Sequence, residues 1–265
     1  MSRRRVSGRP PSLFLLLASL GAVLFLIPLL GVLWRAPWSD LPRLLSSSLV
    51  TEALRLSVVS SITATAISFV FGLPLAWALA RVDFPGRRLV RGLVLLPLVL
   101  PPVVAGAALL FAIGRRGVIG EALYEGTGLV LPFSMWGVVV ATTFVAMPFL
   151  VITVEGALRN VDRRFEDAAS SLGARRWTVI RRVSLPMIGP SVTAGLLLTW
   201  ARAFGEFGAT ITFAGNLQGE TQTLPLAVFI ALESDREVAV ALSLVMVAVS
   251  LGVLVALRDR WWRAS

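Results

Sequence analysis

Lysine, histidine and cysteine, three residue types that carry much of enzyme chemistry, are missing from this chain of 265 residues. Without lysine there is no P-loop lysine, no Schiff base and no lysine general base. Without histidine or cysteine there is no imidazole base, thiol nucleophile, disulfide or ordinary zinc site. We therefore expect no catalytic residue, no metal site and no cofactor bound by this chain. If the work of this chain needs the energy of ATP, another chain must hydrolyse the nucleotide.

Apolar residues, in contrast, make up 56% of the chain and give it a mean hydropathy of +0.82, too high for an ordinary soluble domain. A membrane-crossing helix needs roughly 20 mostly apolar residues. Six segments qualify, namely 12–34, 49–80, 89–113, 132–155, 187–213 and 237–257. The sequence therefore predicts an all-α, polytopic transmembrane bundle of six helices. It forms one domain over 12–257, with cytoplasmic tails at 1–11 and 258–265.

Two of these segments leave alternatives open. The first follows a basic start, "MSRRRVSGRP", as the core of a cleaved signal peptide would. It is long for a signal core and no clear small-x-small cleavage site follows, so we expect an uncleaved helix. The third contains "LLPLVLPPVV" at 95–104, where proline either opens a helix or bends one.

All 25 basic residues are arginine, and the formal net charge is +10. If the N-terminus is cytoplasmic, 18 arginines fall on the inside and only 5 in outside loops. The inside segments are then 1–11, 81–91, 155–186 and 258–265. The positive-inside rule therefore predicts that both termini are cytoplasmic. Because the arginines border apolar segments rather than forming one surface interleaved with aromatic residues, we expect a lipid membrane and no nucleic acid as partner.

One charged stretch, "RRFEDAASSLGARRWTVIRRVSLP" at 163–186, lies between two apolar segments. Its apolar residues at helical spacing form a narrow stripe of Phe165, Ala168, Ala169 and Leu172. Asp162 is a plausible N-cap and Gly173 can end the helix. So short a helix is not stable alone in water and needs a surface to pack on. Lipid headgroups and a soluble partner are both possible, and the alanine-rich stripe favours the partner because alanine permits close approach.

The same stretch resembles the signature of binding-protein-dependent ABC importer permeases. That signature reads Glu-Ala-Ala, three residues, Gly, nine residues, Ile-x-Leu-Pro; here Asp167 replaces the Glu and Val183 the Ile, at the same spacing. The resemblance implies the MetI-like importer-permease fold. It also implies that the coupling segment, 159–186, docks into a cleft on a cytoplasmic ATPase subunit, which binds the ATP. The expected ATPase-coupling residues are Glu166, Asp167, Ala168, Ala169, Leu172, Gly173, Leu185 and Pro186.

A second resemblance, over 201–229 and 84–106, is to molybdate permeases, and the overall likeness extends over about 50–257. Sulfate permeases share the layout, but "GATITFAGN" and "TQTLPLA" favour molybdate or tungstate. The resemblance implies a homodimer in a prokaryotic inner membrane, served by an extracytoplasmic oxyanion-binding protein and working by alternating access. The alternatives are a sulfate or thiosulfate permease and an ion-coupled secondary carrier, which would leave the docking signature unexplained.

Several polar residues lie within apolar segments, where a charge costs roughly 2.5–3.5 kcal/mol. Arg202 and Glu206 share a helix face. Arginine suits a tetrahedral oxyanion, but we favour a structural ion pair because the carboxylate would repel an anion. Glu52 and Arg55 form a similar predicted pair, either with each other or across to Arg202 and Glu206. The tentative pathway residues are Arg202, Gly205, Glu206, Gly208 and Thr210, the glycines for close packing and the threonine for either a passing anion or its own helix.

Overall fold

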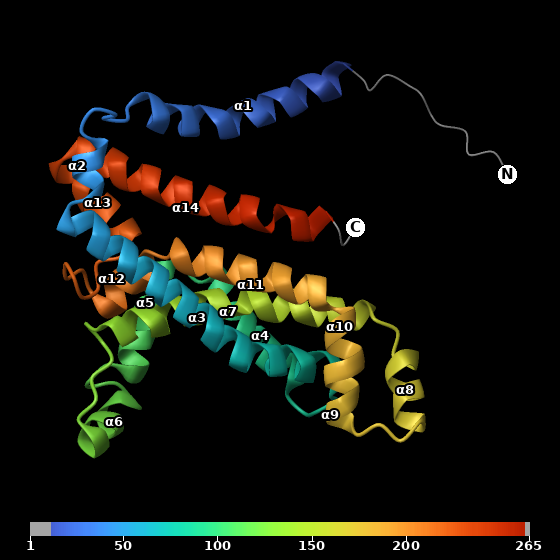
Figure 1. The fold of residues 1–265 in the computed structure, drawn as a ribbon. Coiled ribbons are helices and arrows are strands. Elements are labelled where there is room, and N and C mark those ends of the chain that lie inside the picture. Colours follow the sequence, from blue (N-terminus) through green and yellow to red (C-terminus); the bar gives the residue numbers. More distant parts are fainter. Residues whose placement is uncertain (1–11, 263–265) are drawn as a thin grey trace.

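The structure, a computed structural model, describes residues 12–262, with side-chain surroundings described to residue 255 (Figure 1). Every regular element in this part of the chain is helical, as predicted. The long and intermediate helices are α1 (Ser12–Trp34), α3 (Ser48–Arg81), α4 (Arg87–Val99), α5 (Pro102–Ile113), α7 (Met135–Asn160), α11 (Gly189–Phe204), α13 (Leu224–Ser234) and α14 (Arg236–Trp262). The short ones are α2 (Leu41–Leu45), α6 (Gly120–Thr127), α8 (Arg164–Ser171), α9 (Arg176–Val179), the π-helix η1 (Ile180–Ser184), α10 (Leu185–Met187) and α12 (Gly208–Ala214). The predicted N-terminal tail lies outside the described residues, and α14 continues into the predicted C-terminal one.

The prediction of six helices is wrong as a count, because two predicted spans are broken. Four helices are each long and apolar enough to cross a membrane: α1, α3, α7 and α14. The predicted span 89–113 divides into α4 and α5, and the predicted span 187–213 into the end of α10, α11 and α12. A fifth span is reached only when Arg176–Met187 and α11, which are bent by 75° relative to each other, are counted as one span.

Proline explains two of these breaks. Both α5 and α11 carry a proline in their first turn. A proline has no N–H to donate to the preceding turn and is tolerated where a helix begins. The apolar character continues across each break, so hydropathy alone joins what the backbone separates.

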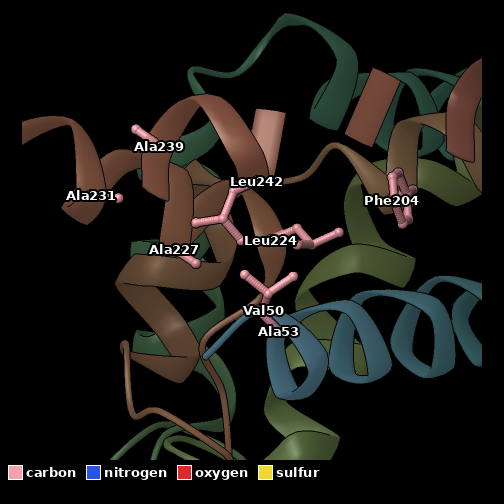
Figure 2. Close-up of a cluster of buried hydrophobic side chains, with 8 residues drawn as sticks. All are labelled: Val50, Ala53, Phe204, Leu224, Ala227, Ala231, Ala239 and Leu242. Atoms are coloured by element: carbon pink, nitrogen blue, oxygen red, sulfur yellow. The ribbon is translucent and has the colours of Figure 1, made fainter. Parts of the chain in front are cut away.

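The centre of the bundle is α7, which packs along α3 and α11. The buried face of α3 is built mainly of alanine, serine and glycine, which lets the helix axes approach closely. At one end of the bundle, α3, α11, α13 and α14 meet in a buried apolar cluster (Figure 2). Its members are Val50, Ala53, Phe204, Leu224, Ala227, Ala231, Ala239 and Leu242. Toward the other end, α3 and α7 form a second cluster that also holds Ile188.

The two ends of the bundle carry different elements. Figure 1 shows α8, α9 and α10 at one end, toward which α1 begins and α14 ends, and α2, α6 and α13 at the other. Helix α1 buries no residue and lies beside α14, so its apolar side chains remain available to lipid. The start of α1 and the end of α14 therefore lie toward the same end of the bundle as α8 (Figure 1).

Candidate functional site

The predicted coupling helix is α8, and its first turn begins close to the predicted residue. Arg163 is the N-cap residue, one position later than expected, and its own side chain does not cap. The carboxylate of Asp162 instead accepts a hydrogen bond from the Arg164 N–H at 3.0 Å. Glu166 and Asp167 lie in the first turn, where negative charge is favoured by the helix dipole.

The end of α8 is at Gly173, as the sequence predicts. Gly173 has a φ of +85°, the left-handed conformation that glycine adopts without strain. The N–H of Ala174 donates to Ala169 O at 3.1 Å, and the N–H of Gly173 donates to Ser170 O at 3.0 Å. These two bonds make a Schellman motif. The helix is therefore terminated at both ends by local interactions.

The apolar stripe of α8 faces away from the rest of the chain. Phe165 is 56% exposed and Leu172 is 89% exposed, and α8 buries no residue. Trp177, at the start of α9, is 69% exposed. Large apolar side chains that stay uncovered on a charged segment are typical of an interaction surface.

The two adjacent acidic residues of α8 are separated by the structure. Glu166 lies between α8, α3 and η1, where its Oε1 accepts hydrogen bonds from Ser184 Oγ at 2.8 Å and Arg81 Nε at 3.2 Å. Asp167 is exposed, and its carboxylate makes no hydrogen bond within the described part of the chain. A polar cavity of about 190 Å³ between α3, α8 and η1 is lined by both residues. Sequence reasoning gave the two carboxylates one role, whereas among the described residues the Glu166 carboxylate has hydrogen-bond partners and the Asp167 carboxylate has none.

Leu185 and Pro186, also predicted as ATPase-coupling residues, lie where this segment joins the membrane helices and not on its exposed stripe. They belong to α10, directly after the π-helix. Leu185 packs against the cluster shared by α3 and α7. A π-helix is rare and frequently marks a functional site. These residues therefore stand where the segment joins the 75° bend into α11.

A second charged network, which sequence reasoning missed, lies at the same end of the bundle. Glu155 of α7, with 8% of its side chain exposed, accepts from Arg91 Nε at 2.9 Å and forms an ion pair with Arg159 at 2.9 Å. Arg87 and Arg91 also donate to Leu79 O near the C-terminus of α3, at 2.8 and 3.3 Å. The i, i+4 spacing of Glu155 and Arg159 was a usable signal. These arginines, first counted as orientation signals, also hold α3, α4 and α7 together.

Arg202 and Glu206 form the ion pair that the sequence suggested. Glu206 is 2% exposed, and its Oε1 accepts a hydrogen bond from the Ala209 N–H at 2.7 Å. Its Oε2 faces the Arg202 guanidinium without the geometry of a hydrogen bond. The pair therefore bridges the break between α11 and α12 and satisfies the first turn of α12, which is a structural role.

The two glycines predicted to line the pathway differ in how closely other atoms pack around them. A Cβ at Gly208 would lie 2.6 Å from Pro102 Cβ, so α12 and α5 touch through this glycine. A Cβ at Gly205 would meet only Ala201 O, at 3.5 Å. Thr210 is fully buried, and its Oγ1 has no hydrogen-bond partner within the described residues, whereas Thr212 bonds back to Gly208 O at 2.8 Å. Close packing is thus a property of Gly208 and not of Gly205.

At the opposite end of the bundle, the predicted pair of Glu52 and Arg55 is wrong. Within the described residues, no ion pair joins them. Glu52 Oε2 instead accepts from Gln218 Nε2 at 3.4 Å, which ties α3 to the loop before α13. Both residues line a cavity of about 470 Å³ together with Glu220. The tertiary contact to the loop replaces the local pair.

Comparison with known proteins identifies the family. Residues 68–263 match the model of the binding-protein-dependent transport system inner membrane component. The chain belongs to this family. It is therefore a multi-pass membrane permease of an ABC transporter, and the resemblance drawn from the signature around Gly173 is confirmed.

Individual relatives of this permease extend over most of its length. The molybdenum transport system permease protein ModB of Mycobacterium tuberculosis is 46% identical over 230 residues, which is 87% of each chain. The sulfate transport system permease protein CysT of Escherichia coli is 36% identical over 256 residues, 96% of this chain and 92% of its own.

Among solved structures, a bacterial ABC transporter that imports the polysaccharide alginate superposes with a TM-score of 0.70 at 19% identity. The superposition covers 94% of this chain and 96% of that one. The likeness confirms the importer-permease fold, although not its division into six unbroken spans.

Proposed function

We propose that this permease carries molybdate or tungstate across the prokaryotic inner membrane, as the membrane subunit of an ATP-driven importer working by alternating access. The observation that carries the proposal is the ranking of relatives: a molybdenum permease at 46% identity and a sulfate permease at 36%. The "GATITFAGN" and "TQTLPLA" sequences support the same substrate class. A sulfate or thiosulfate permease is the second candidate, since the sulfate relative covers more of the chain.

The same proposal includes the assembly. Two copies of the chain surround the path, a cytoplasmic ATPase subunit binds and hydrolyses ATP, and an extracytoplasmic binding protein delivers the oxyanion. No cofactor binds to this chain. The exposed Phe165 and Leu172 of α8 support a protein partner such as the ATPase, because so short a helix with uncovered apolar side chains needs a surface to pack on.

The proposed orientation places both termini in the cytoplasm. Support comes from the arginine bias and from the arrangement in Figure 1, where α1 begins and α14 ends toward the end of the bundle that carries α8. A helix that docks on an ATPase must face the cytoplasm, so the N-terminal start of α1 belongs there too.

The test is uptake of radiolabelled molybdate into proteoliposomes that contain the permease, its ATPase and the binding protein. We expect uptake that needs ATP, that excess tungstate suppresses and that excess sulfate leaves nearly unchanged. If excess sulfate suppresses uptake as strongly as tungstate does, the permease belongs with the sulfate carriers instead. Uptake that continues without ATP but stops when ionophores collapse the ion gradients would indicate a secondary carrier.

A further inference from the structure

Helix α8 has few means of attachment to the rest of the permease. It buries no residue, and it packs beside α9 and η1, which are themselves one turn or so long. If α8 receives a push or pull from the ATPase, as the proposed function requires, that movement must pass to the membrane helices through a stiff contact. Apolar packing around α8 does not supply one.

A single carboxylate oxygen of Glu166 supplies this stiff contact. Glu166 Oε1 accepts from Ser184 Oγ at 2.8 Å and from Arg81 Nε at 3.2 Å, and Arg81 Nη2 lies 3.1 Å from the same oxygen. The three residues belong to α8, η1 and α3. Only 6% of the Arg81 side chain and 17% of the Glu166 side chain are exposed, and Ser184 is 1% exposed. Charge-assisted hydrogen bonds between groups this little exposed are stronger than ion pairs on the open surface.

Two further hydrogen bonds join the start of α8 to the C-terminal end of α3. Arg81 Nη2 donates to Val161 O at 3.2 Å, just before α8, and Arg163 donates to Ala80 O at 3.5 Å, the C-terminal end of α3. Ser184 ends the π-helix that leads through α10 to the 75° bend and α11. A displacement of Glu166 therefore reaches two spans at once: α3 directly, and α11 through the π-helix.

We propose that Glu166 is the positioning residue that couples movement of α8 to α3 and α11, with Arg81 and Ser184 as its partners. Asp167, the next residue, lies outside this contact and belongs to the exposed side of α8. The coupling role rests on the proposed function, because it requires an ATPase that moves α8. The contact itself can be tested without transport.

The structural test uses amide hydrogen exchange of the purified permease dimer in detergent, with no ATPase present. In Glu166→Gln, the amides of 164–172 should exchange about tenfold faster than in the wild type, because the neutral amide weakens the bonds to Arg81 and Ser184. In Asp167→Asn they should exchange only about twofold faster, because this exposed carboxylate loses no hydrogen bond and only its interaction with the helix dipole. Equal rates in all three proteins would overturn the proposal.

The functional test uses the reconstituted complex and measures molybdate taken up per ATP hydrolysed. Glu166→Gln should capture the ATPase as well as the wild type and hydrolyse ATP, but its uptake per ATP should fall about tenfold. The charge-swapped pair Arg81→Glu with Glu166→Arg should recover part of the loss that each single change causes. Glu121→Gln, an exposed acidic residue of α6, is the matched control and should keep the wild-type ratio.

Two functional outcomes overturn the proposal. One is an unchanged uptake ratio in Glu166→Gln, and the other is loss of ATPase capture, which would place Glu166 on the docking surface instead. If the wild-type complex takes up no molybdate, the proposed function fails, whereas the exchange experiment still decides whether Glu166 holds α8.

Discussion

Gly208 stands where α12 meets α5, and replacing it tests the close approach of these two helices. A Cβ at Gly208 would lie 2.6 Å from Pro102 Cβ and 3.2 Å from Val103 N. The contact is reciprocal, since a Cβ at Gly106 of α5 would lie 2.7 Å from both Ala209 O and Thr212 Cβ. Carbon atoms in contact lie about 3.5–4.0 Å apart, so Gly208→Ala must move α5 and α12 apart by roughly 1 Å.

The expected magnitude follows from two opposing effects. Overpacking costs about 1–3 kcal/mol, and alanine regains only part of its helix-interior advantage of about 1 kcal/mol over glycine, because Gly208 is the first residue of α12. The net loss is about 1–2 kcal/mol, which lowers Tm by roughly 2–8 °C in a chain of this size. Neither neighbour relieves the clash cheaply, because Pro102 and the Val103 N–H are held in the first turn of α5.

The assay is thermal unfolding of the purified permease in detergent, followed by the fluorescence of its 8 tryptophans. Gly205→Ala is the matched control, three residues earlier, because its Cβ would meet only Ala201 O at 3.5 Å. Its stability should change by less than about 0.5 kcal/mol. Equal Tm values for Gly208→Ala and Gly205→Ala would refute the close approach of α5 and α12.

Two further predictions concern the other end of the bundle. Glu155→Ala leaves Arg91 and Arg159 without their shared carboxylate, and we expect the free energy of unfolding to fall by about 2 kcal/mol. This is less than for a fully buried pair, because Arg159 is half exposed. Thermal unfolding measures the loss, and an unchanged Tm would contradict it. Gly173→Trp should insert normally but uncouple ATP hydrolysis from uptake by blocking close docking, whereas Gly173→Asn, which tolerates a φ of +85°, should retain most uptake. Wild-type uptake by the tryptophan variant would remove Gly173 from the docking surface.

Local signals were sufficient for the α8 segment. Its start near Asp162 and its end at Gly173 depend on residues within a few positions of each other, so their chemistry can be seen in the sequence. The same holds for Arg202 and Glu206, four residues apart on one face. The Glu52 and Arg55 pair failed under the same rule, because Gln218 reaches Glu52 from a distant loop.

The breaks in the spans were present in the sequence as prolines but were hidden by hydropathy. A window average responds to the apolar residues around Pro101 and Pro190 and not to the missing N–H groups. The sequence left a helix start and a kink as equal interpretations of the 95–104 stretch. The structure shows a start, at the first turn of α5.

The amino-acid sequence by itself determined that this is an all-helical membrane permease with a separately capped α8, because hydrophobicity, arginine bias and capping act over short distances along the chain. Only the tertiary structure decided which charges on different helices meet. Glu166 bonds to Arg81, which lies 85 positions away in the sequence, and Glu155 bonds to Arg91, 64 positions away. Such pairs depend on how α3, α4, α7 and α8 pack, since a charge enclosed within the protein needs a partner and packing alone brings one within reach.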